Sequence, residues 1–209
     1  GKDVKLNSEI HEWKINNVQR YSNVLSNVLY KDLVQTKSTS SSRQNKLVSF
    51  YPGKFYRNLL SDNIVTQGGG VLAEKTTGLS HSPIIGWAYD GNPIYGSYGY
   101  SDASDSNSDI QVVRSGYVLS PSDVVDRPSG FSNGFFVEDF KFDNSGELDQ
   151  YNGRFAKTPE FPNGTYAYYA GINSSTYAPT FPFFIGHQYR SVPITQNVDQ
   201  DFKFESSQL

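Results

Sequence analysis

The chain contains no cysteine among its 209 residues, so disulfides, thiolate metal sites and a cysteine nucleophile are excluded. It has no apolar run near the ~20 residues that a membrane-spanning helix needs. Its formal net charge of −3 lacks the basic excess typical of nucleic-acid-binding surfaces. We therefore expect no nucleic-acid partner and no insertion into a membrane.

Methionine is also absent, no signal peptide is visible, and the first residue is Gly1, so we expect a piece of a longer protein. Aromatic residues are abundant instead: they make up 15% of the chain, with 15 Tyr and 14 Phe. Rings must therefore supply much of any core. Together with many Gly, Pro, Ser, Asn and Asp residues, this composition favours short strands joined by turns.

Alternating segments bounded by turn residues predict the strands. They are Lys46–Tyr51, Ile84–Tyr89, Gln111–Arg114, Gly116–Leu119, Phe135–Phe142, Thr165–Ala170 and Phe183–Gly186. Residues 20–33 have the spacing of a helix but also suit a pair of strands. Gly68-Gly69-Gly70 predicts a turn, because a phosphate-binding loop needs a lysine at a fixed spacing and a following helix.

These elements predict a mainly β, sandwich-like antiparallel domain with long loops and little helix. We place the domain at residues 46–192. Residues 1–45 form an N-terminal extension or linker-proximal segment, and residues 193–209 form an edge strand or a linker.

The segment His81–Gly96 holds three glycines and two prolines with a His, an Asp, two Tyr and a Trp, a composition that suits neither a helix nor a disordered linker. His81 and Asp90 can act as a base and its orienting carboxylate. Alternatively, His81 bonds to a backbone carbonyl and Asp90-Gly91-Asn92-Pro93 forms a turn, which we favour.

Further blocks of the same character follow this segment. They are Pro128-Ser129-Gly130, Val137-Glu138-Asp139-Phe140, Gly146–Phe155, Thr158–Tyr169 and Phe181–Gly186. In order and spacing, over roughly residues 78–190, the blocks resemble the YHYH domain family. The motif that names the family, Tyr-His-Tyr-His, reads Tyr166-Ala167-Tyr168-Tyr169 here, so any metal role of those two imidazoles is not available.

The resemblance also implies a setting. YHYH domains occur in secreted bacterial proteins and in large virion structural proteins of marine phages, notably cyanophages. The segment Phe184–Ser191 and the lack of cysteine resemble the phage branch. This implies a location in the virion and other virion proteins as partners.

Two candidate sites emerge from the polar residues. The first is a binding cleft for a sugar or a metal, formed by His81, Asp90, Tyr95, Asp149, Asn152, Arg154 and Tyr166. Its alternative is structural, because a buried Asp149 and Arg154 would satisfy each other or a loop backbone. The second is a calcium site at Asp105, Asn107 and Asp109, whose alternate oxygens match the start of an EF-hand loop, although simple solvation suits the loop as well.

We predict a non-enzymatic structural or adhesion module of a phage tail or fibre, which binds host-surface glycans or other virion proteins. No catalytic residues and no certain cofactor are expected, with calcium as the one candidate ion and a homo-oligomer as a candidate assembly. The alternative is a metal-assisted hydrolase of a cell-surface polymer that uses His81, Asp90 and Asp149. This enzyme requires His81 and a carboxylate to converge, whereas a structural module requires them to be buried and paired.

Overall fold

The computed structural model describes residues 3–5, 12–14, 16, 34–36, 46–48, 51 and 53–193. Over these residues the protein is mainly β, and its α-helix is the six-residue α3 (Lys54–Leu59). Within the same ranges, no helix has the length and apolar character needed to cross a membrane. The predicted fold class, mainly β with long loops and little helix, is confirmed.

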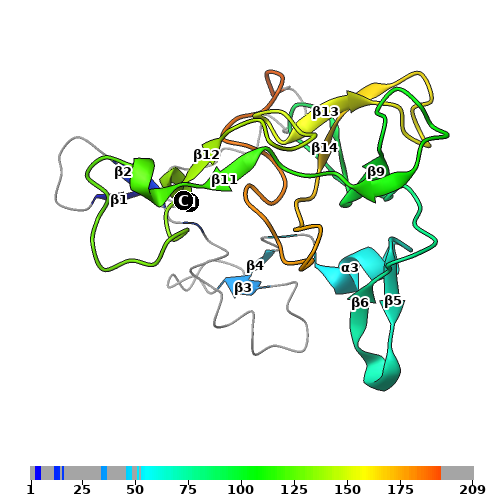
Figure 1. The fold of residues 1–209 in the computed structure, drawn as a ribbon, viewed down its shortest axis with the longest axis horizontal. Helices are drawn as coiled ribbons and strands as arrows, with labels where there is room; N and C mark the ends of the chain where they lie inside the picture. Colours follow the sequence, from blue (N-terminus) through cyan, green and yellow to red (C-terminus); the bar gives the residue numbers. More distant parts are fainter. Residues whose placement is uncertain are drawn as a thin grey trace, which may run out of the picture.

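A four-stranded sheet forms the centre of the molecule (Figure 1). Its strand order is β13 (Gly153–Ala156), β14 (Thr165–Tyr169), β8 (Pro93–Tyr95) and β7 (Ile84–Trp87). The outer pairs, β13–β14 and β8–β7, are antiparallel, whereas β14 and β8 run parallel. This parallel pair joins segments more than 70 residues apart, so it brings the His81–Gly96 segment beside the Tyr166–Tyr169 motif.

The remaining strands form separate antiparallel pairs. The pairs are β1 (Asp3–Lys5) with β2 (Glu12–Lys14), β3 (Val34–Thr36) with β4 (Lys46–Val48), β5 (Ile64–Thr66) with β6 (Leu72–Glu74), β9 (Tyr98–Tyr100) with β10 (Ile110–Val112), and β11 (Tyr117–Leu119) with β12 (Phe140–Phe142). Three short 3-10 turns accompany them: η1 (Gly68–Gly70), η2 (Pro121–Asp123) and η3 (Val137–Asp139). Frequent Gly, Pro, Asn and Asp residues keep these strands short.

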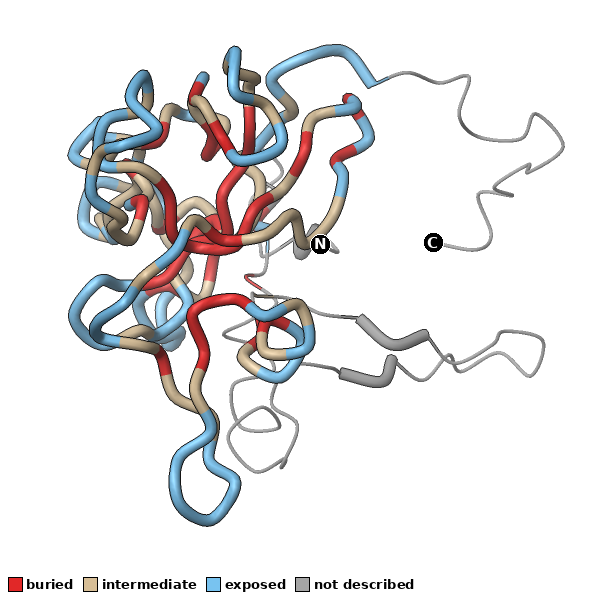
Figure 2. The backbone as a smooth tube through the Cα atoms, turned by 90° about the vertical axis from the view of Figure 1, so that its right-hand side faces the viewer, coloured by how far each residue is buried: buried red, intermediate tan, exposed pale blue. Residues whose placement is uncertain are grey.

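Tyrosines build the core. Tyr95 and Tyr169, from the parallel strands, stack with ring centroids 5.8 Å apart and pack with Val113, Leu148 and Ala167. The β9–β10 pair covers this face of the sheet, because Val113 packs with Tyr95 and Tyr169, and the Tyr169 ring lies close against Gly99. The two layers give the sandwich-like arrangement, and Figure 2 shows the buried residues (red) gathered in the interior of the molecule and the exposed ones in its outer loops.

A buried ion-pair network attaches the β5–β6 hairpin and α3 to this core. Arg57 is fully buried, and its guanidinium donates to Asp62 at 2.6 Å and to both carboxylate oxygens of Glu74 at 2.7 and 3.0 Å. Glu74 also accepts a hydrogen bond from the Tyr98 hydroxyl at 3.0 Å. The tip of the hairpin, by contrast, is exposed and projects from the body of the molecule (Figure 2).

A short N-terminal stretch packs against the opposite end. The buried Asn16 donates from its backbone amide to Phe135 at 2.8 Å and from its side chain to Gly134 at 3.0 Å. Trp13 is buried against Phe136, with ring centroids 5.2 Å apart. The N-terminal segment therefore contributes to the packed structure at this point.

Several strands lie where the alternation predicted them: β4, β7, β10, β11 and β14. Two predictions were wrong. Within Phe135–Phe142, Val137–Asp139 forms η3 and the strand begins only at Phe140, because the Asp139 carboxylate accepts from the amides of Gly134 and Phe136. Phe183–Gly186 forms turns, with Phe183 at φ +73°. The prediction for residues 20–33 lies outside the described residues.

The network at Arg57 predicts a large loss of stability in the variant Arg57→Ala. Two buried carboxylates, Asp62 and Glu74, would lose their counter-charge, which destabilises a protein by about 3–5 kcal/mol. Urea unfolding measures the change. Arg114→Ala is the control, because the Arg114–Glu147 pair is largely exposed on the arginine side and contributes about 1 kcal/mol or less. Equal losses in both variants would contradict this assignment.

Candidate functional site

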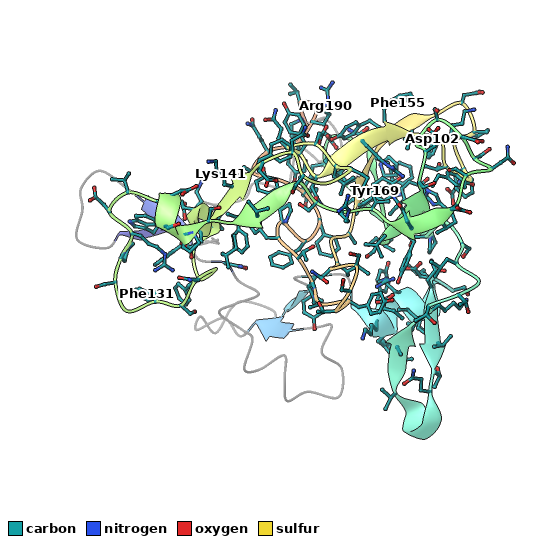
Figure 3. The ribbon with its side chains drawn as sticks, viewed as in Figure 1. Asp102, Phe131, Lys141, Phe155, Tyr169 and Arg190 are labelled. Carbon is teal, nitrogen blue, oxygen red and sulfur yellow. The ribbon has the colours of Figure 1, made fainter. Side chains whose placement is uncertain are left out.

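Strand β14 divides the predicted site residues between its two faces. Successive side chains of a strand point to opposite faces, so Tyr166 and Tyr168 share one face while Ala167 and Tyr169 share the other. The inner face, with Tyr169, meets the core. The outer face carries Tyr168 and Phe155, and Figure 3 shows Phe155 and Arg190 on the side of the sheet opposite Tyr169.

On the outer face, Asp90 is the centre of a closed hydrogen-bond network. Its carboxylate accepts from the Tyr168 hydroxyl at 2.6 Å, from the Asn92 side chain at 2.9 Å and from the Ser191 amide at 3.2 Å. Burial alone would raise the pKa of Asp90, but these hydrogen bonds outweigh it and hold the pKa below its usual value. Asp90 therefore stays ionised as a structural acceptor.

The predicted turn at Asp90 is confirmed. The Asn92 amide donates to Asp90 at 3.2 Å, and Gly91 has φ +83°, a conformation that glycine adopts without strain. Tyr168 extends the network, because its hydroxyl also accepts from the Arg190 amide at 2.7 Å. Residues 90 and 190 are thus joined through one phenol of the central strand.

Asp149 forms a second closed network on the same face. Its carboxylate accepts from the Tyr166 hydroxyl at 3.0 Å and from the Tyr151 amide at 2.9 Å. Asn152 completes the turn with φ +64°, and its side-chain amide donates to the Tyr169 carbonyl at 2.8 Å. Above the turn, the Arg190 guanidinium lies 5.7 Å from the centre of the Tyr166 ring.

His81 lies on the inner side, away from both carboxylates. Its ring meets those of Tyr95 and Tyr100, each with its centroid 5.0 Å away, and Tyr169 at 6.2 Å. Nδ1 lies 2.9 Å from the Ser82 carbonyl, so it carries the proton and donates it. Nε2 is then a bare acceptor, and it is buried without a hydrogen-bond partner.

Burial lowers the pKa of His81 and outweighs the opposing effect of its hydrogen bond to Ser82. The imidazole is therefore neutral in the folded protein near neutral pH. The polar neighbours of His81 include Arg154, whose guanidinium donates to the Tyr100 carbonyl at 2.7 Å and lies 5.2 Å from the centre of the Tyr169 ring. Arg154 Nε and the Tyr169 hydroxyl are also buried without hydrogen bonds.

Tyr95 completes the inner group. Its hydroxyl lies 2.8 Å from Glu160 and 2.9 Å from Thr158, and burial raises its pKa. The seven residues predicted to line one cleft are therefore separated. His81, Tyr95 and Arg154 lie on the inner face. On the outer face, Asp149 bonds to Tyr166 and Asp90 bonds to Tyr168. The Asn152 side chain bonds to the Tyr169 carbonyl. Asp149 and Arg154 do not bond to each other but to backbone groups, the Tyr151 amide and the Tyr100 carbonyl, as the second form of the structural prediction has it.

The acidic loop of residues 101–109 folds through its own hydrogen bonds. Asp105 accepts from the Asn107 backbone and side chain at 2.9 and 3.3 Å, and Asp102 accepts from Ser104 at 2.8 Å. Asp109 contributes its carbonyl to the Ser101 amide at 2.7 Å. Across the described residues, no three His, Cys, Asp or Glu side chains form a group that could hold a metal. Calcium binding by Asp105, Asn107 and Asp109 stays a prediction.

Several residues of the two networks were not predicted. Glu160 and Arg190 join their networks only through long-range contacts, with Tyr95 and with Tyr166 and Tyr168. We expected aromatic rings to supply much of the core, yet Trp87 and Tyr89 are 60% and 73% exposed. Trp87 and Tyr89 lie at the end of a predicted strand and in the turn that follows, a position from which their exposure could have been predicted.

These features define a small mainly β domain with a tyrosine-lined central sheet and carboxylate-bonded tyrosines on its outer face. Comparison with known families agrees with the sequence resemblance: the family described as YHYH protein matches residues 60–182. The match covers more than half of the chain, which therefore belongs to the YHYH protein family. No curated protein and no solved structure matches the chain.

The Asp90 network predicts that Tyr168→Phe destabilises the protein by about 1–3 kcal/mol, because the buried carboxylate of Asp90 loses a hydrogen-bond donor. Urea unfolding measures the change. Tyr56→Phe is the matched control: its hydroxyl bonds to the Ile85 carbonyl at 3.1 Å at an exposed site, and we expect a change within about 0.5 kcal/mol. A Tyr168→Phe variant as stable as the control would show that the network contributes little.

The depressed pKa of His81 predicts a pH-dependent stability. The unfolded chain binds this proton more readily, with a pKa of about 6.5, so the free energy of unfolding falls as the pH drops from about 7.5 to about 5.5. His81→Phe keeps a ring among the tyrosines and should reduce this fall. Since burial also lowers the pKa of His187, His187→Phe is measured beside it. An unchanged fall in His81→Phe would refute the assignment.

Proposed function

We propose that this domain is a non-catalytic structural or adhesion module of a phage virion, in the tail or its fibres. Its rigid β scaffold binds host-surface glycans or other virion proteins. The virion setting rests on the sequence resemblance of Phe184–Ser191 to the phage branch of the family. The observation that carries the non-catalytic assignment is the separation of His81 from Asp90 and Asp149 by the central sheet.

A hydrolase would need these groups to converge on one substrate. Asp90 and Asp149 are instead engaged with Tyr168 and Tyr166 and with turn amides on the outer face. His81 lies among aromatic rings on the other face. Asp90 and Asp149 therefore hold Gly- and Pro-rich turns in place, as expected of polar groups with a structural role.

Exposed aromatic side chains give the proposed adhesion a physical basis. Trp87, Tyr89 and Phe155 are each at least 60% exposed, and all three are carried by the central sheet or its β7–β8 turn. Tyr189 supports Tyr89 edge-on, with ring centroids 6.4 Å apart. Exposed aromatic faces on a rigid scaffold suit the C–H surfaces of sugars and the anchor positions of protein interfaces.

This proposal predicts that Trp87→Ala and Tyr89→Ala weaken binding to host cells or to arrayed envelope glycans by about tenfold or more. Because both side chains are exposed, unfolding free energies should stay within about 0.5 kcal/mol of the original. Val71→Ser, at the exposed tip of the β5–β6 hairpin, is the control. Unchanged binding in both aromatic variants would remove this surface as the adhesion site.

A further inference from the structure

A cavity of about 420 Å³ lies between β2, η2, η3 and β12; β2 and β12 are labelled in Figure 1. This volume falls within the range of small-ligand sites, about 300–1,000 Å³. Trp13, Val124, Val125 and Phe140 supply its apolar walls. Trp13 comes from the N-terminal segment, outside the residues that the YHYH family matches.

The polar residues of the cavity are Ser120, Asp123, Glu138 and Lys141. Lys141 and Asp123 lie 3.4 Å apart with more than half of each side chain exposed, so their attraction is weak and either can exchange it for another partner. Two carboxylates, one ammonium and one hydroxyl thus surround an apolar floor. The group offers several charged acceptors and one charged donor.

The walls are held in place before any ligand arrives. Both oxygens of Glu138 accept from the Lys14 amide, at 3.0 and 3.2 Å, which joins β2 to η3. The next residue, Asp139, is buried in an ion pair with Arg127 at 2.6 Å. Its carbonyl also accepts from the Ser120 amide at 2.7 Å, which ties η3 to η2. The cavity is therefore pre-organised, which lowers the entropic cost of binding.

We propose that this cavity binds a neutral saccharide. Asp123 and Glu138 repel phosphate and sulfate groups, while a purely apolar ligand would desolvate Asp123 and Lys141 without replacing their hydrogen bonds. A sugar ring supplies hydroxyls to the carboxylates and the ammonium, and C–H groups to Val124 and Val125, beside the buried Trp13. This inference rests on the proposed glycan-binding function and assigns it a specific site.

The two tryptophans of the chain allow a direct test. Trp87→Phe leaves Trp13, at the cavity wall, as the only indole, so its fluorescence reports on this site. Methyl glycosides of glucose, galactose and mannose, and N-acetylglucosamine, are titrated into the 209-residue chain at millimolar concentrations. We expect at least one of them to give a saturable change in Trp13 emission.

The same titration in Asp123→Asn should show affinity reduced by about tenfold, because a charge-assisted hydrogen bond is replaced by a neutral one. Asp126→Asn is the matched control. It makes the same chemical change three residues away, at an exposed position that does not line the cavity and whose φ of +57° suits Asn. Its affinity should equal that of the parent.

A Trp13 emission that no saccharide changes would overturn the proposal, as would equal affinities in Asp123→Asn and Asp126→Asn. If the parent chain binds host cells, Trp87→Ala does not, and no saccharide changes Trp13 emission, the proposed adhesion function stands and this site is refuted. A Trp13 response without any host-cell binding would support the cavity and refute the adhesion surface on β7.

Discussion

The buried guanidinium of Arg57 is the interaction on which the rest of the described structure depends. Its charge is neutralised by Asp62 and Glu74, and each of these carboxylates reaches into the core. Asp62 accepts from the Ser82 hydroxyl at 2.6 Å, and that hydroxyl accepts from the Tyr98 amide at 3.0 Å. A single cation thus fixes the β5–β6 hairpin against the segment that begins at His81.

This attachment constrains the strands that follow. A side chain at Gly96 would collide with Asp62 and Ser82, so only glycine lets β8 and β9 approach the ion pair this closely. From there β8 enters the central sheet beside β14 and presents Tyr95 to Tyr169. The charged network of Arg57, Asp62 and Glu74 therefore positions the tyrosine core from its edge.

The central sheet also separates polar groups that the sequence places near one another. It places His81 with Arg154 and Tyr169 on one face, and Asp90 and Asp149 on the other. Asp90 and Asp149 stabilise turns, and the His81 ring packs among tyrosine rings. Two accessible surfaces remain, the exposed aromatics of β7, its turn and β13, and the cavity beside Trp13, and we propose recognition at both.

The sequence alone determined the β class, several strands, the Asp90–Pro93 turn and the YHYH resemblance, because alternation, turn residues and motif order are local properties. Tertiary structure decided which polar residues meet. Asp90 and His81 are nine residues apart in sequence yet lie on opposite faces of the sheet, while Asp90 meets Tyr168 and Arg57 meets Glu74. Strand register and the parallel β8–β14 pairing set these encounters, and both depend on contacts between segments distant in the chain.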